Sequence, residues 1–368
     1  MLRSLLSRFG LVLLIAMLAC SSLAWGGNSA TAYKVLSPIS HGKLTIFPVV
    51  ASTTHDTSGF ITLDEGIRSG AVVVTEAGRV GGLIRGPQRR IPVSSGAQVN
   101  TLVLINNSKR PLILLAGEIV TGGKQDRVIG KDRVIPAESD PVDLSVFCVE
   151  PGRWTETSAQ FSSMKSQMAQ PSVRSKAMIA KDQQQVWNSV GTANAAIAGA
   201  IGGIPPAGRT SYAKIFEDEQ VRKAIAAQAA PVEESYSSSI RQLRDQRAVG
   251  VVVAVGGTFI WADIFASTAL LEKYWPKLVR SYAAEAITTQ TSGKAVSLPE
   301  AQQFLERTEG SRQVVESEPG VYRQSETIAP DFKLFTLASL LPGTGFDLHI
   351  SKIADANGYI PELGRLQR

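Results

Sequence analysis

The densest group of residues able to do chemistry lies at residues 116–127 and ends in Gly122-Gly123-Lys124-Gln125-Asp126-Arg127. It follows the apolar segment 111–115, which we expect to be a strand. A sheet fixes the position of side chains at a strand end, while glycines let backbone amides approach a ligand. The two glycines would form an anion-binding nest, with Lys124 and Arg127 adding positive charge and Gln125 lying between them. The pattern favours binding of an anionic small molecule such as a phosphate compound, and a glycine turn flanked by solvated charges is the alternative.

The same stretch is not a nucleotide-binding P-loop. Gly117 and Gly122 have the P-loop separation, but Gly123 displaces the lysine by one position. Gln125 also stands where a Ser or Thr would bind magnesium. We therefore infer no magnesium-dependent P-loop chemistry.

A second polar group occupies residues 147–154, where a predicted strand runs into a Gly/Pro turn. Arg153 would hold a phosphate or carboxylate, and Trp154 would stack on a ring. The alternative pairs Arg153 with Glu150 and buries Trp154 in the core. We expect Cys148 to pack as a small buried side chain and not to act as a nucleophile.

Three carboxylates are the candidates for catalysis or cation binding: Glu118, Asp126 and Glu150. If their strands are neighbours, a pair of them would bind a divalent cation or do acid/base work. We assign no metal ligands, and a zinc site is not expected because the three histidines lack metal-ligand spacing: His41, His55 and His349.

The N-terminus predicts export from the cytoplasm. Arg3 and Arg8 precede an apolar run over residues 9–19, followed at once by small residues. The run is too short to cross a bilayer, so residues 1–24 read as a cleaved signal peptide and the product as periplasmic or secreted. In the alternative, Cys20 sits in an imperfect lipobox and becomes lipidated. We expect the protein to contact a membrane only through the signal peptide or through such a lipid anchor.

Composition indicates a globular chain with little affinity for nucleic acids. Apolar residues make up 44% of the sequence, enough for one large or two ordinary domains. Without Arg3 and Arg8, 36 basic residues face 32 acidic ones, and they are scattered without interleaved aromatic residues. Oligomeric state cannot be read from these features.

Residue patterns predict an α+β fold. Short apolar runs separated by turn residues predict an antiparallel, strand-rich N-terminal half, in which residues 106–110 join two strands as a hairpin loop. Helical periodicity follows in the centre, with a loop or frayed end at 191–203 and a helix end at Pro231. Gly256-Gly257 predicts a tight hairpin turn, and Ser297 with Glu300 predicts a capping box at the start of a helix. Residues 332–341 and 346–350 are predicted to be closing strands.

These patterns divide the chain into five segments. The signal peptide spans 1–24 and a strand-rich part spans 33–165. A helical insert or connector spans 166–247, and a hairpin, helices and closing strands of the same domain span 248–350. Residues 351–368 form a tail.

The chain resembles an uncharacterised family, the ARG and Rhodanese-Phosphatase-superfamily-associated protein domain, over about residues 44–350. The resemblance rests on the sequences at 61–65, 116–127, 148–154, 262–265 and 274–278. It implies recognition of ADP-ribose or a related NAD-derived nucleotide, and it implies no catalytic residues. A pyrophosphate would suit the glycine nest with Lys124, Arg127 and Arg153, and an adenine would suit Trp154.

Three functions remain open at this point. The leading hypothesis is a non-enzymatic, exported binding module for an anionic small molecule. One rival is a hydrolase of a nucleotide or ADP-ribosyl bond that uses Glu118, Asp126 or Glu150. The other is an envelope structural or interaction protein. A cleft uniting Glu118 and Glu150 would favour the enzyme, and salt bridges that occupy them would favour the interaction protein.

Overall fold

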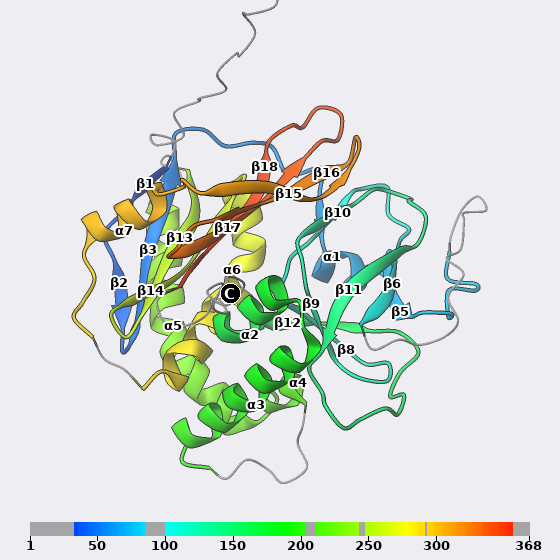
Figure 1. Cartoon of the computed structure of the whole chain (residues 1–368), viewed down its shortest axis with the longest axis horizontal. Coiled ribbons are helices and arrows are strands. Elements are labelled where there is room, and N and C mark those ends of the chain that lie inside the picture. Colours follow the sequence, from blue (N-terminus) through cyan, green and yellow to red (C-terminus); the bar gives the residue numbers. More distant parts are fainter. Residues whose placement is uncertain (1–32, 85–99, 204–210, 243–246, 291–292, 356–368) are drawn as a thin grey trace, which may run out of the picture.

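The computed structural model describes residues 33–84, 100–203, 211–242, 247–290 and 293–355. Within these residues the chain forms one large sheet, two smaller sheets and a group of helices (Figure 1). The predicted α+β fold class is confirmed, with a strand-rich first part, central helices and a closing series of strands. The predicted signal peptide, Cys20 and the end of the predicted tail from residue 356 lie outside the described residues.

The large sheet joins the two ends of the described chain. Its strand order is β1, β3, β13, β14, β18, β17, β16 and β15, with β2 added on β3, and neighbouring strands are antiparallel. In Figure 1 the blue N-terminal strands therefore lie beside the yellow-green and red ones. The strands of this sheet are β1 (Tyr33–Val35), β2 (Ile39–His41), β3 (Leu44–Ala51), β13 (Ala248–Val255), β14 (Thr258–Phe265), β15 (Ser311–Glu318), β16 (Tyr322–Ile328), β17 (Phe332–Ser339) and β18 (Asp347–Ala354).

The predicted hairpin at Gly256-Gly257 is confirmed and lies in the middle of this sheet. Both glycines have positive φ, 59° and 81°, as a type I′ turn requires. The turn joins β13 to β14, whose residues are buried along almost their whole length. A local turn signal thus fixes the centre of the largest sheet.

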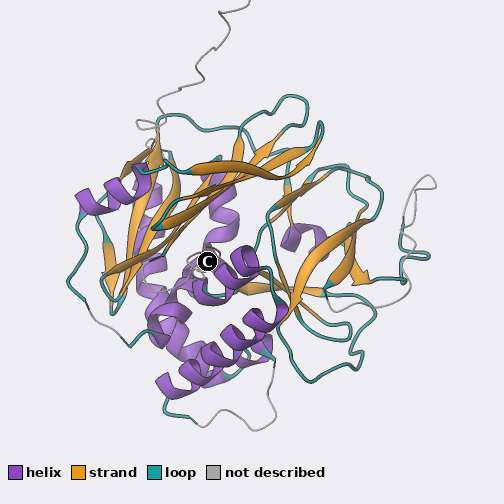
Figure 2. Cartoon of the chain, in the orientation of Figure 1, coloured by secondary structure: helices purple, strands orange, loops and turns teal. Residues whose placement is uncertain are grey.

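The two faces of the large sheet pack against different helices. Strand alternation sends Trp261 to the inner face, where it joins the core formed with α5 (Glu219–Gln242) and α6 (Thr268–Thr288). Ala262 and Ile264 point to the outer face, where they pack with Ala301 of α7 (Leu298–Glu306). The predicted capping box is present at the start of α7, because Ser297 and Glu300 bond to each other's backbone amides. In Figure 2 most of the helices lie together, and α7 lies away from them.

The prediction that Pro231 ends a helix is wrong. Helix α5 continues through Pro231, although proline lacks the amide that a helix interior uses. Val221, Ile225, Val232 and Tyr236 are buried on both sides of it in one core. Burial of this continuous apolar stripe outweighs the lost hydrogen bond.

The prediction of a loop at residues 191–203 is also wrong over most of its length. Helix α3 (Gln183–Ala200) includes the alanine- and glycine-rich segment. Val190, Ala193 and Ile197 recur at helical spacing and are buried in the main core. The remaining helical elements are α1 (Leu63–Arg68), α2 (Pro171–Ser175), a π-helical turn (Lys176–Ala180) and α4 (Tyr212–Ile215).

Two smaller sheets form the other group of strands. The six-stranded sheet has the order β12, β8, β9, β11, β6 and β5, and the three-stranded sheet has the order β10, β7 and β4. Their strands are β4 (Ile61–Thr62), β5 (Val72–Glu76), β6 (Thr101–Asn106), β7 (Leu112–Leu114), β8 (Glu118–Thr121), β9 (Arg127–Ile129), β10 (Arg133–Ile135), β11 (Val142–Cys148) and β12 (Ser162–Met168).

The predicted hairpin around residues 106–110 is wrong. Strand β6 pairs with β5 and β11, whereas β7 pairs with β4 and β10 in the other sheet. Leu104 and Leu112 still share one apolar cluster, so the two strands face each other across a core instead of lying side by side. The Asn106 side chain holds the corner by donating to the carbonyls of Arg110 and Pro136.

Candidate functional site

The backbone amides of the predicted anion nest already have acceptors within the chain. Gly122 and Gly123 have positive φ, 127° and 50°, and form the predicted tight turn. The Gly122 amide donates to Asp126 Oδ1 at 3.0 Å, and the Lys124 amide donates to Glu76 Oε1 at 2.8 Å. The Gly123 amide donates to a serine hydroxyl at 3.2 Å. Two carboxylates of the protein thus occupy the place proposed for a ligand anion.

The predicted arginines and carboxylates meet, and they pair with one another. Arg153 contacts Glu150 directly, lies 3.4 Å from Asp126 and donates to the carbonyl of Gly123 at 3.0 Å. Arg127 is fully buried, and burial lowers its pKa. Burial also raises the pKa of Asp126, which accepts hydrogen bonds from the Gly122 amide and from a serine hydroxyl. This group is a buried ionic network whose charges are paired, although Glu76 Oε2, Gln125 Oε1 and Arg153 Nε have no hydrogen-bond partner among the described residues.

Two side chains of the predicted ligand site reach the surface. Trp154 is 44% exposed, and Lys124 Nζ lies 5.0 Å from the centre of its ring. The alternative that buried Trp154 in the core is therefore wrong, whereas the pairing of Arg153 with Glu150 is confirmed. Gln125 is buried and donates to the Glu150 carbonyl at 3.1 Å.

Glu118 belongs to a different cluster from Asp126 and Glu150. Its carboxylate lies 2.6 Å from Lys277 Nζ, and Asp64 lies 2.7 Å from the same nitrogen. Burial alone would lower the pKa of Lys277, but the contacts with Glu118 and Asp64 outweigh it and raise the pKa. Three segments that carry the family resemblance thus meet at one buried ammonium group.

Cys148 packs as a buried side chain, as predicted. It is fully buried, and burial raises the pKa of its thiol. Its backbone amide and carbonyl both bond to the Gln183 side chain at 2.9 Å, which continues the hydrogen bonding of the strand. A thiol held in this state is a poor nucleophile.

A second ionic network, which sequence patterns did not predict, lies on the inner face of the large sheet. His349 Nδ1 lies 2.6 Å from Asp132, and its Nε2 lies 3.0 Å from Asp263. Arg174 holds Asp263 through two hydrogen bonds of 2.9 and 3.1 Å, and Ser351 donates to it at 2.7 Å. Asp132 also accepts the Ala116 amide at 2.7 Å, which ties the smaller sheets to the large one.

Electrostatics keeps both partners of this network charged. Burial opposes the imidazolium, but Asp132 and Asp263 raise the pKa of His349 to about 9. Burial also opposes the carboxylate of Asp263, yet Arg174 and His349 hold its pKa well below the ordinary value. Because these side chains are at most 1% exposed, a substrate has no access to them. The network therefore serves to position strands, although it contains groups typical of acid/base sites.

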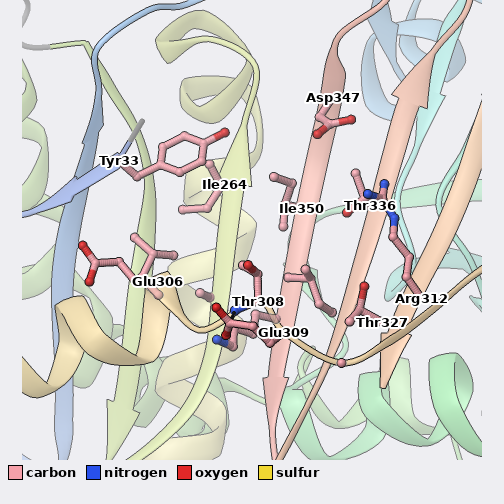
Figure 3. A pocket seen from close by; sticks show the side chains of 15 residues that line it. Tyr33, Ile264, Glu306, Thr308, Glu309, Arg312, Thr327, Thr336, Asp347 and Ile350 are labelled. Carbon is pink, nitrogen blue, oxygen red and sulfur yellow. Dashed lines mark hydrogen bonds between the residues drawn. The ribbon is translucent and has the colours of Figure 1, made fainter. Parts of the chain in front are cut away.

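The outer face of the large sheet carries a hollow of about 410 Å³ beside the end of α7 (Figure 3). Its floor includes two rows of side chains that cross neighbouring strands. One row runs through Ala262, Lys352, Leu334, Thr327 and Arg312, and the other through Ile264, Ile350 and Thr336. Strands lie about 4.8 Å apart, so each row places apolar and polar side chains at regular intervals. The floor is mostly aliphatic and becomes polar toward β15 and β16.

The polar end of the hollow carries groups without partners in the described part of the chain. Thr327 and Thr336 are 5% and 8% exposed, and their hydroxyls have no hydrogen-bond partner among the described residues. Arg312 is exposed and donates no hydrogen bond there. Neither threonine hydroxyl is among the buried polar atoms that lack a partner, so both stay accessible from the hollow. The two hydroxyls and the guanidinium can therefore bond to an acceptor that enters the hollow.

Lys352 is committed to a structural contact at the other end of the row. Its ammonium donates to the carbonyls of Phe304 and Arg307 at the end of α7, and its Nζ lies 4.0 Å from the centre of the Phe332 ring. Burial lowers the pKa of Lys352 to about 7, and nearby Arg307 acts in the same direction. Lys352 thus holds α7 over the sheet.

Among the described residues, no group of three or more histidine, cysteine, aspartate or glutamate side chains is placed to hold a metal ion. None of the helices in the described ranges combines the length and the apolar character needed to span a bilayer.

Sequence patterns missed the residues of the hollow. Residues 332–341 and 346–350 were predicted as strands and β17 and β18 confirm them, but β15 and β16 were not predicted. The period-two alternation of β17 and β18 is the signal that could have placed Leu334, Thr336 and Ile350 on one face. Nothing local indicates that Arg312 joins them, because its neighbours on the sheet come from distant segments.

Comparison with protein families finds a match over residues 32–351 to the model of the ARG and Rhodanese-Phosphatase-superfamily-associated Protein domain. Comparisons with curated proteins and with solved structures find no match.

Proposed function

The chain belongs to the ARG and Rhodanese-Phosphatase-superfamily-associated Protein domain family, and we propose that it is an exported binding protein for a small molecule with an anionic group. We place the ligand in the hollow on the outer face of the large sheet. The anionic group bonds to Arg312 and to the hydroxyls of Thr327 and Thr336. The aliphatic part of the ligand lies on Ile264 and Ile350.

One observation carries this proposal. The hollow combines an aliphatic floor with three adjacent donors that lack acceptors within the described residues. Ligand sites are typically concave and mostly apolar, with a few polar groups that orient the ligand. By contrast, the amides of Gly122, Gly123 and Lys124 are engaged by protein acceptors.

The catalytic candidates supply no comparable argument for an enzyme. Glu118, Asp126 and Glu150 are at most 4% exposed, and Glu118 and Glu150 each contact a cation of the protein. A general base must lie within reach of a substrate proton, which argues against catalysis by these carboxylates. The same ion pairs are what an envelope structural or interaction protein would show, so that function is the second candidate.

The proposal is tested by thermal unfolding of the mature protein with a panel of anions near millimolar concentration. The panel contains phosphate, 4-methylpentanoate, leucine, ADP-ribose and NAD. A ligand present at 100 times its dissociation constant should stabilise the protein by about 2.7 kcal/mol. Stabilisation by none of the five compounds would overturn the proposal.

Three variants locate the site. Arg312→Gln should weaken binding about 10- to 100-fold, because a hydrogen bond to a charged group contributes about 1.5–3 kcal/mol. Arg222→Gln, at an exposed arginine on α5, is the matched control and should bind as the parent does. If Lys124→Ala abolishes binding while Arg312→Gln does not, the ligand site lies at the Gly122-Gly123 turn instead.

A further inference from the structure

Two exposed residues of opposite charge line the hollow without a hydrogen bond or a close ion pair. Arg312 lies at the polar end of the floor, and Asp347 lies at the start of β18 (Figure 3). Neither side chain has a hydrogen bond or an ion pair within 4 Å among the described residues, although the positive charge of Arg312 acts on the Asp347 carboxylate. Figure 3 shows the Arg312 side chain running along the sheet toward the end at which Asp347 lies. The space between them can be bridged by a ligand.

The other charged side chains that line the hollow are engaged. Lys352 donates to the carbonyls of Phe304 and Arg307. Glu306 accepts a hydrogen bond from the side-chain amide of Gln302 at 2.8 Å, and Glu309 accepts one from the backbone amide of Thr308 at 3.2 Å. Arg312 and Asp347 are therefore the charged lining groups left for a ligand in this part of the chain.

The hollow presents charges of both signs. Three carboxylates, of Glu306, Glu309 and Asp347, line it together with two cations, of Arg312 and Lys352. A ligand that carries both charges can satisfy Arg312 and Asp347 at once, because its cation meets Asp347 while its anion meets Arg312.

We infer that the ligand is a zwitterion with an ammonium and a carboxylate group, as in an amino acid or a short peptide. This inference rests on the proposed function. The carboxylate bonds to Arg312 with Thr327 and Thr336, and the ammonium bonds to Asp347. The aliphatic floor around Ile264 and Ile350 takes an apolar side chain. An ammonium–carboxylate contact is stronger than one between neutral groups, which gives Asp347 a role in selecting the ligand.

Calorimetric titration of the full mature protein with matched compounds tests this inference. Leucine carries both charges, 4-methylpentanoate lacks the amine, 2-hydroxy-4-methylpentanoate has a hydroxyl in its place, and 3-methylbutylamine lacks the carboxylate. We expect leucine to bind at least tenfold more tightly than the other three. Alanylleucine distinguishes a free amino acid from a peptide as the source of the zwitterion.

Variants assign the two contacts. Asp347→Asn should remove the preference for leucine over 4-methylpentanoate without weakening the binding of 4-methylpentanoate. Arg312→Gln should weaken both. Asp143→Asn, at an exposed aspartate on β11 of a smaller sheet, is the control and should change neither affinity.

The outcomes separate this inference from the proposed function. If 4-methylpentanoate or the hydroxy acid binds within threefold of the tighter of leucine and alanylleucine, or if Asp347→Asn keeps the preference, the zwitterion inference is wrong. An anion that still needs Arg312 would then leave the proposed function standing. If no compound depends on Arg312, both fall.

Discussion

His349 should make the stability of this protein depend on pH in a window where most proteins show little change. Its pKa is raised from 6.5 to about 9 by Asp132 and Asp263. The folded state thus binds this proton more tightly than the unfolded state does. The stabilisation is fully present below pH 6.5 and is lost as the pH rises through about 9.

The size of the effect follows from the shift. One pKa unit corresponds to about 1.4 kcal/mol, so the shift of His349 contributes about 3 kcal/mol to the free energy of unfolding at pH 6.5. His349→Gln removes the titrating group while keeping a polar side chain. The difference in unfolding free energy between the parent and this variant should therefore shrink by about 3 kcal/mol between pH 6.5 and 9.5.

Denaturant unfolding followed by tryptophan fluorescence measures this difference at several pH values. His41→Gln is the control, because His41 is exposed at the end of β2 and lies outside the network. A difference that stays constant across this range would mean that His349 is neutral in the folded protein. No difference at any pH would refute the view that the network stabilises the fold.

Three further substitutions test how the other buried groups stabilise the chain. Lys277→Met leaves the buried Glu118 and the partly buried Asp64 without their cation and should lower the unfolding free energy by about 3–5 kcal/mol. Lys273→Met, on the same helix but in a half-exposed pair, should cost less than about 1 kcal/mol in the same denaturant titration. Gly123→Ala places a Cβ 2.3 Å from a phenylalanine ring and should destabilise by about 1–3 kcal/mol. Gly59→Ala, which meets open space, is the control and should cost less, so equal melting temperatures for the two variants would contradict this. Pro231→Ala restores a helix-interior amide and should raise the unfolding free energy by about 1–3 kcal/mol, and a decrease would show that α5 depends on its proline.

Local signals in the sequence predicted local structure well. Gly256-Gly257 specified a turn, and Ser297 with Glu300 specified a helix start, because each feature depends on residues within a few positions. The predicted hairpin around Asn106 was wrong because strand pairing depends on residues that are distant in sequence. Alternation at Leu104 and Leu112 indicates that one face of each strand is buried, but it does not indicate which strand lies alongside.

The candidate site could not be predicted because its contacts are distant in sequence. Arg312 lies on β15, a strand with mostly exposed residues and no apolar alternation to reveal it. His349 and Asp132 are 217 positions apart, and nothing near either residue indicates the other. The charged segments that stood out in the sequence, around Arg127 and Arg153, are instead paired internally.

Strand β18 connects the ionic network to the proposed ligand site. His349 and Ser351 point inward and are held by Asp263, whereas Ile350 and Lys352 point outward and line the hollow. Because His349 and Ser351 are held rigidly on the inner face, the positions of Ile350 and Lys352 on the outer face are also fixed. The ionic network should therefore preorganise the hollow without touching a ligand. His349→Gln should then weaken every ligand by the same factor, while Asp347→Asn weakens those that carry an ammonium group. Selective loss of one ligand class in His349→Gln would contradict this division between the two faces of the strand.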